Sequence, residues 1–125
     1  MEINIQDIKT PEYTVSQFFE CWKEKNKDIK DYIQKTYLTS YINRSRIKEM
    51  LDNIDLIGYY LYDKDVITDC RHEVYFRAEI KKGKKTINMY GKANVICETE
   101  PLTPSVSGDW GVNPASILLR WQKGK

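Results

Sequence analysis

The sequence predicts an α+β domain in which N-terminal helices pack on a curved antiparallel sheet. Apolar residues recur at helical spacing up to Asn53 and at alternate positions after it. The 125 residues have the length of one domain, and 41% of them are hydrophobic, enough to fill one core. We therefore expect a single domain over residues 11–121, with flexible ends at residues 1–10 and 122–125.

The first helix is predicted to begin at Thr14, because Thr14 and Gln17 have the spacing of a capping box. Its apolar residues form one stripe at i, i+3, i+4 and i+7: Val15, Phe18, Phe19 and Trp22. Such a stripe predicts that the helix covers the sheet and that Trp22 is a core residue. Asn26 is the expected end of this helix.

Two shorter helices are expected next. Asp28 can cap a second helix, whose apolar residues would be Ile29, Tyr32, Ile33 and Tyr37. A third helix, from about Ser45 to Asp52, would start at Ser45. It would bury Ile47, Met50 and Leu51.

The first strand is expected at residues 54–62, which are apolar on both faces and contain Gly58, so that the strand is buried and bent. Three acidic residues follow closely, Asp63, Asp65 and Asp69. They lack the spacing and the closing glutamate of a calcium loop, which favours a solvated turn and no metal site.

The clearest strand covers residues 72–81, with one face towards the core and one towards water. Its inner residues are His72, Val74, Phe76, Ala78 and Ile80. Lysines around Gly83 predict a solvated hairpin tip before the next strand. That strand has its inner face at Ile87, Met89, Gly91, Ala93, Val95 and Cys97. A last strand is expected at residues 109–113, and the tail after Asn113 could be a helix or an extended segment.

Net charge, cysteine spacing and the length of the apolar runs limit the kinds of partner and cofactor that we expect. A net charge of +2, with both signs mixed along the chain, gives no field to hold a nucleic acid. Cys21, Cys70 and Cys97 lack the close pairs of zinc or redox motifs, and we expect neither a disulfide framework nor a cofactor. No run is long enough for a membrane span, so we expect a soluble protein, cytoplasmic as given and exported only if a leader was trimmed.

Two segments resemble a known family. The helix motif Phe18-Phe19-Glu20-Cys21-Trp22-Lys23 and the run from Trp110 to Leu118 resemble the small N-terminal domain of methicillin-resistance-type penicillin-binding proteins. That domain belongs to the nuclear-transport-factor-2-like, or cystatin-like, superfamily. The resemblance implies a cone-shaped fold whose mouth is a catalytic pocket, a binding site or only a scaffold. Ser45 and Lys48 match one transpeptidase motif, but its companion motifs are absent, so the match is a coincidence.

The candidate site residues follow from the inner phase and from this implied cone. We expect ligand-binding residues at Trp22, Tyr60, Tyr62, His72 and Trp110, with Trp22 and Trp110 near the opening. His72, the only histidine, is the one candidate acid or base.

Three functions are compatible with these residues. The leading hypothesis is a non-enzymatic accessory domain of bacterial type that binds an unknown small molecule or protein and pairs with a second copy through its exposed sheet face. The first alternative is a small-molecule isomerase or dehydratase that uses His72. The second alternative is a component of a surface or conjugative-transfer assembly.

Overall fold

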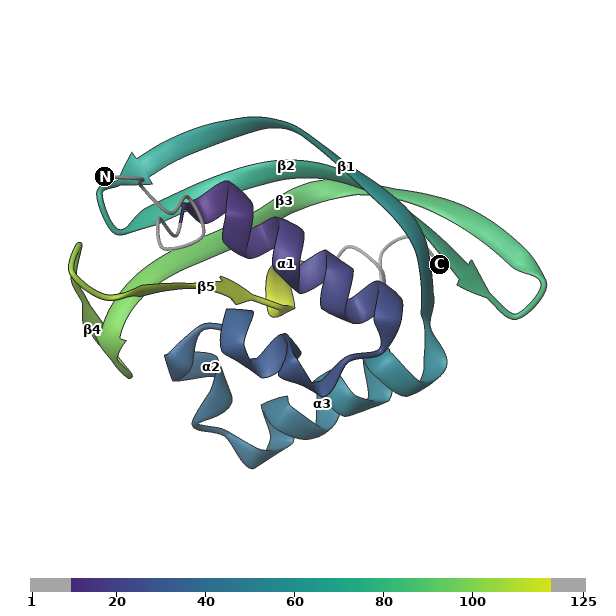
Figure 1. The fold of residues 1–125 in the computed structure, drawn as a ribbon, viewed down its shortest axis with the longest axis horizontal. Helices are drawn as coiled ribbons and strands as arrows, with labels where there is room; N and C mark the ends of the chain where they lie inside the picture. The colour runs from purple at the N-terminus through teal and green to yellow at the C-terminus, as the bar shows by residue number, and fades with distance from the viewer. Residues whose placement is uncertain (1–9, 118–125) are drawn as a thin grey trace, which may run out of the picture.

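The computed structural model describes residues 10–117, which fold as helices against one curved antiparallel sheet (Figure 1). This arrangement confirms the predicted α+β class. The helices come first in the chain: α1 (Pro11–Glu24), the 3₁₀ helix η2 (Lys27–Tyr32), α2 (Lys35–Leu38) and α3 (Tyr41–Asn53). The strands follow: β1 (Asp55–Thr68), β2 (Arg71–Lys82), β3 (Lys85–Glu100), β4 (Thr103–Pro104) and β5 (Asp109–Asn113).

Three long strands form the body of the sheet. β1 pairs with β2 and β2 with β3, all antiparallel, and both β4 and β5 pair with the second half of β3. Gly83, at φ 65°, occupies the tip of the β2–β3 hairpin, as predicted. β5 has the predicted bounds.

β1 differs most from its prediction. It continues to Thr68 instead of ending at Tyr62, because β2 is long enough to pair with all of it. Asp63 and Asp65 therefore lie in the strand, and of the three acidic residues only Asp69 lies in the turn. The predicted burial is also wrong, since Tyr60 and Tyr62 are 57% and 50% exposed. The bend is real, because β1 has three irregularities in its register with β2, and such bulges bend a strand.

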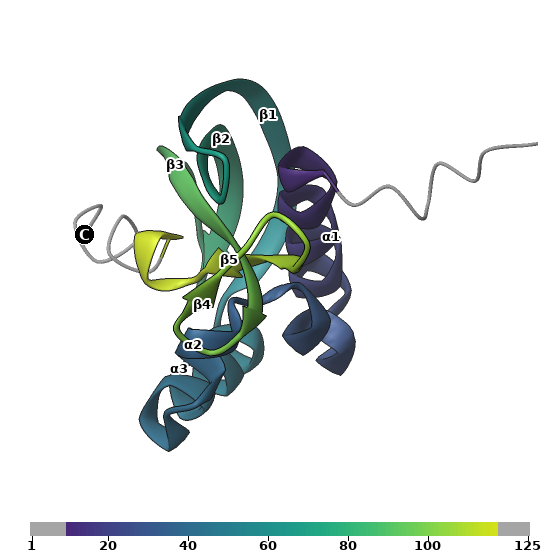
Figure 2. The same ribbon diagram turned by 90° about the vertical axis from the view of Figure 1, so that its left-hand side faces the viewer.

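α1 lies across the concave side of the sheet (Figures 1 and 2). It begins one turn earlier than predicted, because Thr10 is the N-cap and Pro11 fits the first helical position. Thr14 is inside the helix, where its hydroxyl donates to the Thr10 carbonyl at 3.0 Å. The predicted stripe is confirmed, since all four of its residues are at most 1% exposed.

The connection after α1 is more broken than expected. α1 ends at Glu24, with Lys25 in the left-handed region at φ 56°, and Asn26 caps η2 in place of Asp28. Tyr37 belongs to a separate short helix, α2, instead of extending the second helix. Ser40 is the N-cap of α3, and Ser45 is an exposed residue within it, so the predicted start at Ser45 is wrong.

The inner side chains of the sheet and the helices share one core. Val74, Phe76, Ala78 and Ile80 of β2 are at most 1% exposed, and the predicted inner residues of β3 from Met89 to Cys97 are buried too. Ile47, Met50 and Leu51 of α3 complete it, as predicted. The tail after Asn113, for which a helix and an extended segment were the two alternatives, starts as a helix. Residues 115–117 are helical, and the Asn113 side chain accepts a hydrogen bond from the Ala115 N–H at 3.0 Å. The rest of the tail, residues 118–125, lies outside the described residues.

Candidate binding cleft

A cavity of about 500 Å³ opens between α1, η2, α2 and β5, and we call it the aromatic cleft. Ligand pockets commonly have about 300–1,000 Å³. Three aromatic rings and side chains of both charges line it. Its lining residues are Tyr13, Lys30, Asp31, Tyr32, Ile33, Lys35, Leu38, Asp109 and Trp110.

Each aromatic residue reaches the cleft from a different element. Tyr13 is held in the first turn of α1, where its backbone N–H donates to the Thr10 hydroxyl at 3.1 Å. Tyr32 ends η2, and Trp110 lies on β5, opposite Cys97 of β3. The cleft thus depends on contacts between segments about 100 residues apart in the chain, which a sequence pattern does not reveal.

β5 and the link between η2 and α2 are fastened together beneath the cleft. The Gln34 N–H donates to the Val112 carbonyl at 2.9 Å. A Cβ atom at Gly111 would lie only 2.6 Å from the Gln34 Cα, so a glycine is needed for this close approach.

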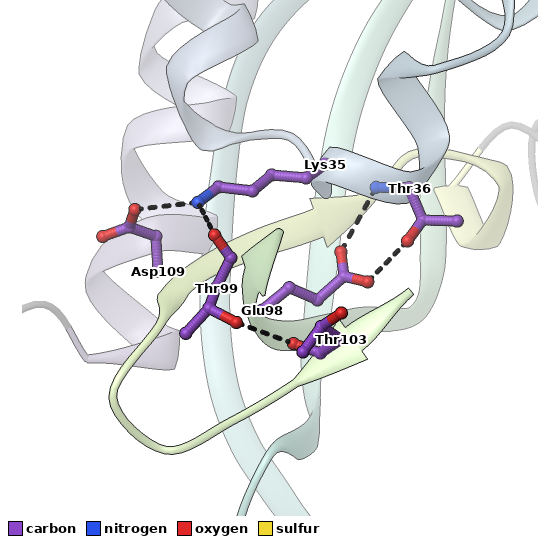
Figure 3. Close-up of polar contacts among 6 residues, drawn as sticks. All are labelled: Lys35, Thr36, Glu98, Thr99, Thr103 and Asp109. Carbon is purple, nitrogen blue, oxygen red and sulfur yellow. Dashed lines mark hydrogen bonds and ion pairs between the residues drawn. The ribbon is translucent and has the colours of Figure 1, made fainter. Parts of the chain in front are cut away.

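Polar contacts hold the rim of the cleft (Figure 3). The Lys35 ammonium donates to the Thr99 carbonyl at 3.0 Å and pairs with the Asp109 carboxylate at 3.2 Å. Beside it, the carboxylate of Glu98, only 2% exposed, accepts hydrogen bonds from the backbone N–H and the hydroxyl of Thr36. These contacts fix the start of α2 against the end of β3.

The chemistry of the cleft favours an aromatic ligand with polar substituents. Burial raises the pKa of Tyr32 above its ordinary value of 10.0, so its hydroxyl, which is protonated at neutral pH in any case, remains a hydrogen-bond donor at higher pH as well. Aromatic rings can stack on a planar ligand, while lysine and aspartate side chains at the rim can pair with groups of either charge.

The structure brings two of the predicted site residues together. The rings of His72 and Trp110 have their centroids 4.9 Å apart, at an angle of 58°. His72 is not among the residues that line the cleft, and among the described residues its buried Nδ1 has no hydrogen-bond partner. Trp110 alone of the five predicted residues lines the cleft.

The other three predicted site residues lie elsewhere. Trp22 is 1% exposed, and its indole N–H donates to the Ile54 carbonyl at 3.0 Å within the core, so it is not near an opening. Tyr60 and Tyr62 stack on each other on the outer face of the sheet, with ring centroids 6.3 Å apart. Strict alternation predicts the inner residues of β2 and β3, but β1 has three bulges. These bulges shift its alternation, so they decide on which face its tyrosines lie.

Sequence reasoning missed most of the cleft. Tyr13 and Tyr32 look like apolar helix residues in the sequence, and Lys35 looks like a surface charge. Glu98, which does not line the cleft but anchors Thr36 beside it, was missed as well, because its phase on β3 is that of the outer, solvated face. No local pattern identifies these residues, since other segments of the chain give them their surroundings.

The described residues, 10–117, offer neither a metal site nor a reactive thiol. No group of three His, Cys, Asp or Glu side chains there could hold a metal ion. Burial raises the pKa of Cys97 and of Cys21, which keeps both thiols protonated and poorly nucleophilic. None of the helices in this part of the chain is long and apolar enough to cross a membrane.

Comparison with known proteins adds no relative. The chain matches no protein-family model, and it matches neither a curated protein nor a solved structure.

Proposed function

We propose that this domain is a non-enzymatic binding module whose aromatic cleft takes a small aromatic molecule with polar substituents. The observation that carries the proposal is the convergence of Tyr13, Tyr32 and Trp110 on one cavity of about 500 Å³. Lys30 and Asp31, for which no ion pair is found within residues 10–117, supply charges of both signs to its lining. A lining of this kind can orient a polar ligand over the rings.

The surroundings of His72 favour binding over catalysis. A general acid or base must reach the proton that it transfers, within about 3 Å or through one water. His72 lies beside Trp110 instead of lining the cleft, and no hydrogen bond of its ring is found within residues 10–117. No hydrogen bond from the described residues therefore orients this imidazole towards a substrate in the cleft.

The test is an NMR titration of the ¹⁵N-labelled protein with benzoate, indole-3-acetate and tyramine as probes. Binding in the cleft should shift the indole N–H signal of Trp110 and leave that of Trp22 in place, because Trp22 is sealed in the core. Tyr32→Leu should weaken binding about tenfold, since one lost aromatic contact is worth roughly 1 kcal/mol or more. Tyr90→Leu, on the outer face, is the matched control.

Two results would contradict the proposal. One is that none of the probes moves the Trp110 signal at millimolar concentration. The other is that Tyr90→Leu weakens binding as much as Tyr32→Leu, which would place the ligand elsewhere.

We also propose that the domain belongs to the nuclear-transport-factor-2-like superfamily. The order of elements supports this membership, with helices first and a curved antiparallel sheet after them. An experimental structure compared with members of that superfamily would test it, and a different strand order would overturn it.

The proposed binding module also pairs with a second copy of the chain, through the outer face of the sheet. Four tyrosines gather there, which we call the tyrosine face: Tyr60, Tyr62, Tyr75 and Tyr90. Arg77 lies between Tyr60 and Tyr90 in the register, and Lys92 lies over the Tyr75 ring at 4.9 Å. Asp63 and Asp65 supply the opposite charge on the same face, so two copies can meet with complementary charges.

Light scattering over a range of protein concentrations tests the pairing. The mass should approach twice that of the monomer as the concentration rises, and Tyr60→Glu with Tyr90→Glu should return it to the monomer value. A mass that stays at the monomer value at every concentration would overturn the dimer but leave the cleft proposal intact.

A further inference from the structure

A second cavity, of about 350 Å³, lies at the helical end of the molecule, and we call it the basic pocket. It is bounded by the end of α1, by η2, by α2 and by α3. Its lining residues are Lys25, Lys27, Ile29, Lys30, Leu38, Arg44, Ile47, Lys48, Leu51 and Asp52. Neither the sequence motifs nor the aromatic cleft accounts for it.

The floor of the basic pocket is apolar and well packed. Ile29, Ile47 and Leu51 are 1%, 4% and 9% exposed, and Leu38 packs against the same core. An aliphatic group that covers this floor would remove its remaining apolar surface from water, which is favourable.

The wall of the pocket is strongly basic, with five cationic side chains against the single carboxylate of Asp52. One of the five, Lys25, is already used. Its ammonium pairs with Asp55 at 2.9 Å and donates to the carbonyls of Leu51 and Ile54. Within residues 10–117, no ion pair is found for Lys27, Lys30 or Lys48, so these charges remain available to an anion.

We propose that the basic pocket binds a small amphiphilic anion, namely a carboxylate with a short aliphatic chain. The apolar floor takes the chain, and the ammonium groups of the wall pair with the carboxylate. A volume of about 350 Å³ suits one short chain better than a protein segment. This proposal is independent of the aromatic cleft, although Lys30 and Leu38 line both cavities.

The first experiment is calorimetric titration of the full chain with octanoate. We expect saturable binding of one molecule per chain. Acetate carries the charge without the chain, and 1-octanol carries the chain without the charge. Both should bind at least about tenfold more weakly than octanoate if floor and wall act together. Binding of acetate or of 1-octanol as tight as that of octanoate would overturn the proposal.

The second experiment uses a pair of variants with the same change in net charge. Lys27→Gln with Lys48→Gln removes two charges from the wall, both on exposed side chains, so the fold should survive. Octanoate binding should weaken about fivefold, as expected for the loss of two solvent-accessible ion pairs. The matched control is Lys84→Gln with Lys85→Gln at the hairpin tip, which should bind octanoate like the wild type.

A third arm separates a free carboxylate from an anionic membrane surface. Vesicles of phosphatidylglycerol should neither retain the chain at physiological salt nor compete with octanoate. Retention by these vesicles that falls equally in both double variants would overturn the proposal in favour of general electrostatic attraction. Neither double variant changes Tyr13, Tyr32 or Trp110, so failure here leaves the cleft proposal untouched.

Discussion

One face of the sheet is buried and the other is exposed, although the same strands form both. On β1, Tyr59 and Tyr60 are neighbours in sequence, yet Tyr59 stacks on Phe19 of α1 at 5.0 Å while Tyr60 is 57% exposed. The inner face is closed by helices, and the outer face, where it carries the tyrosine face, is open. A tyrosine is thus a core residue or a surface residue according to what packs on its side of the sheet.

One end of the outer face is an exception. Glu98 has the outer phase on β3, but it is 2% exposed because Thr36 of α2 and the backbone of Leu102 cover it. The open face and this covered end differ in their connections. A loop and a short helix reach the end of β3, whereas Tyr60, Tyr62 and Tyr90 of the tyrosine face are at least half exposed.

The largest effect is expected from Trp22→Ala in the closed interior. It removes a ring that is 1% exposed and leaves the Ile54 carbonyl without its donor. The free energy of unfolding should fall by about 3–5 kcal/mol. At protein concentrations at which the chain is a monomer, Tyr90→Ala on the open face should cost less than about 1 kcal/mol. Urea denaturation of both variants measures this difference, and similar losses would break the contrast between the faces.

Glycine-to-alanine substitutions compare a strand position that another segment packs against with one that lies open. Gly111→Ala puts a Cβ about 2.6 Å from the Gln34 backbone, so we expect a loss of about 3 kcal/mol. Gly58→Ala meets no atom within 4 Å and should be close to neutral. Thermal unfolding of the two variants compares them directly. A neutral Gly111→Ala would mean that the η2–α2 link moves freely over β5.

Glu98→Gln tests the covered end of the outer face. The carboxylate accepts hydrogen bonds from Thr36 and from the Leu102 N–H. In the glutamine variant an NH₂ group, which is itself a donor, would face one set of these donors. We expect a loss of about 2 kcal/mol in the free energy of unfolding. Glu79→Gln, in the uncovered part of the outer face, is the control. Equal stability of the two variants in urea would refute the anchoring role of Glu98.

The smallest effect is expected at the exposed start of β1. A hydrogen bond from Lys25 lowers the pKa of Asp55 below its usual value. Because the folded pKa is depressed, this stabilisation is present above the unfolded pKa and is lost as the pH falls through the folded pKa. Asp55→Asn should therefore be slightly less stable than the wild type at neutral pH and equal to it in acid. Urea midpoints of the wild type and of Asp55→Asn, measured from neutral to acid pH, test this, with Asp69→Asn as the control. If the Lys25–Asp55 pair contributes nothing, the difference between the two midpoints will not change with pH.

Much of the fold could be predicted from local patterns, because they record which side of each element is buried. The α1 stripe, the alternation of β2 and β3 and the bounds of β5 were all predicted from spacing. Helix starts were predicted less well. Thr10 and Ser40 are the caps of α1 and α3, but Thr14 and Ser45 offer the same chemistry a few residues later, and only the chain geometry selects between them.

The candidate site was predicted only in part, for a different reason. The face on which Trp110 lies could be predicted, because it shares the phase of Val112 on the last strand, whereas its place near an opening followed only from the cone that the resemblance implies. Tyr13 and Tyr32 could not, because their positions in the cleft depend on how α1 and η2 sit against β5. Trp22 was predicted both as core and as site, and the packing of Phe18 and Phe19 around it leaves it in the core.

The sequence by itself determined the class of the fold, the covering helix, the two faces of β2 and β3 and the solvated hairpin tip, since each follows from the period of the apolar residues along one segment. Only the tertiary structure decided which tyrosines face water, which carboxylate is buried and which side chains line the two cavities. These features depend on bulges, on the close approach at Gly111 and on contacts between segments distant in the chain. The local spacing of apolar residues carries no information about them.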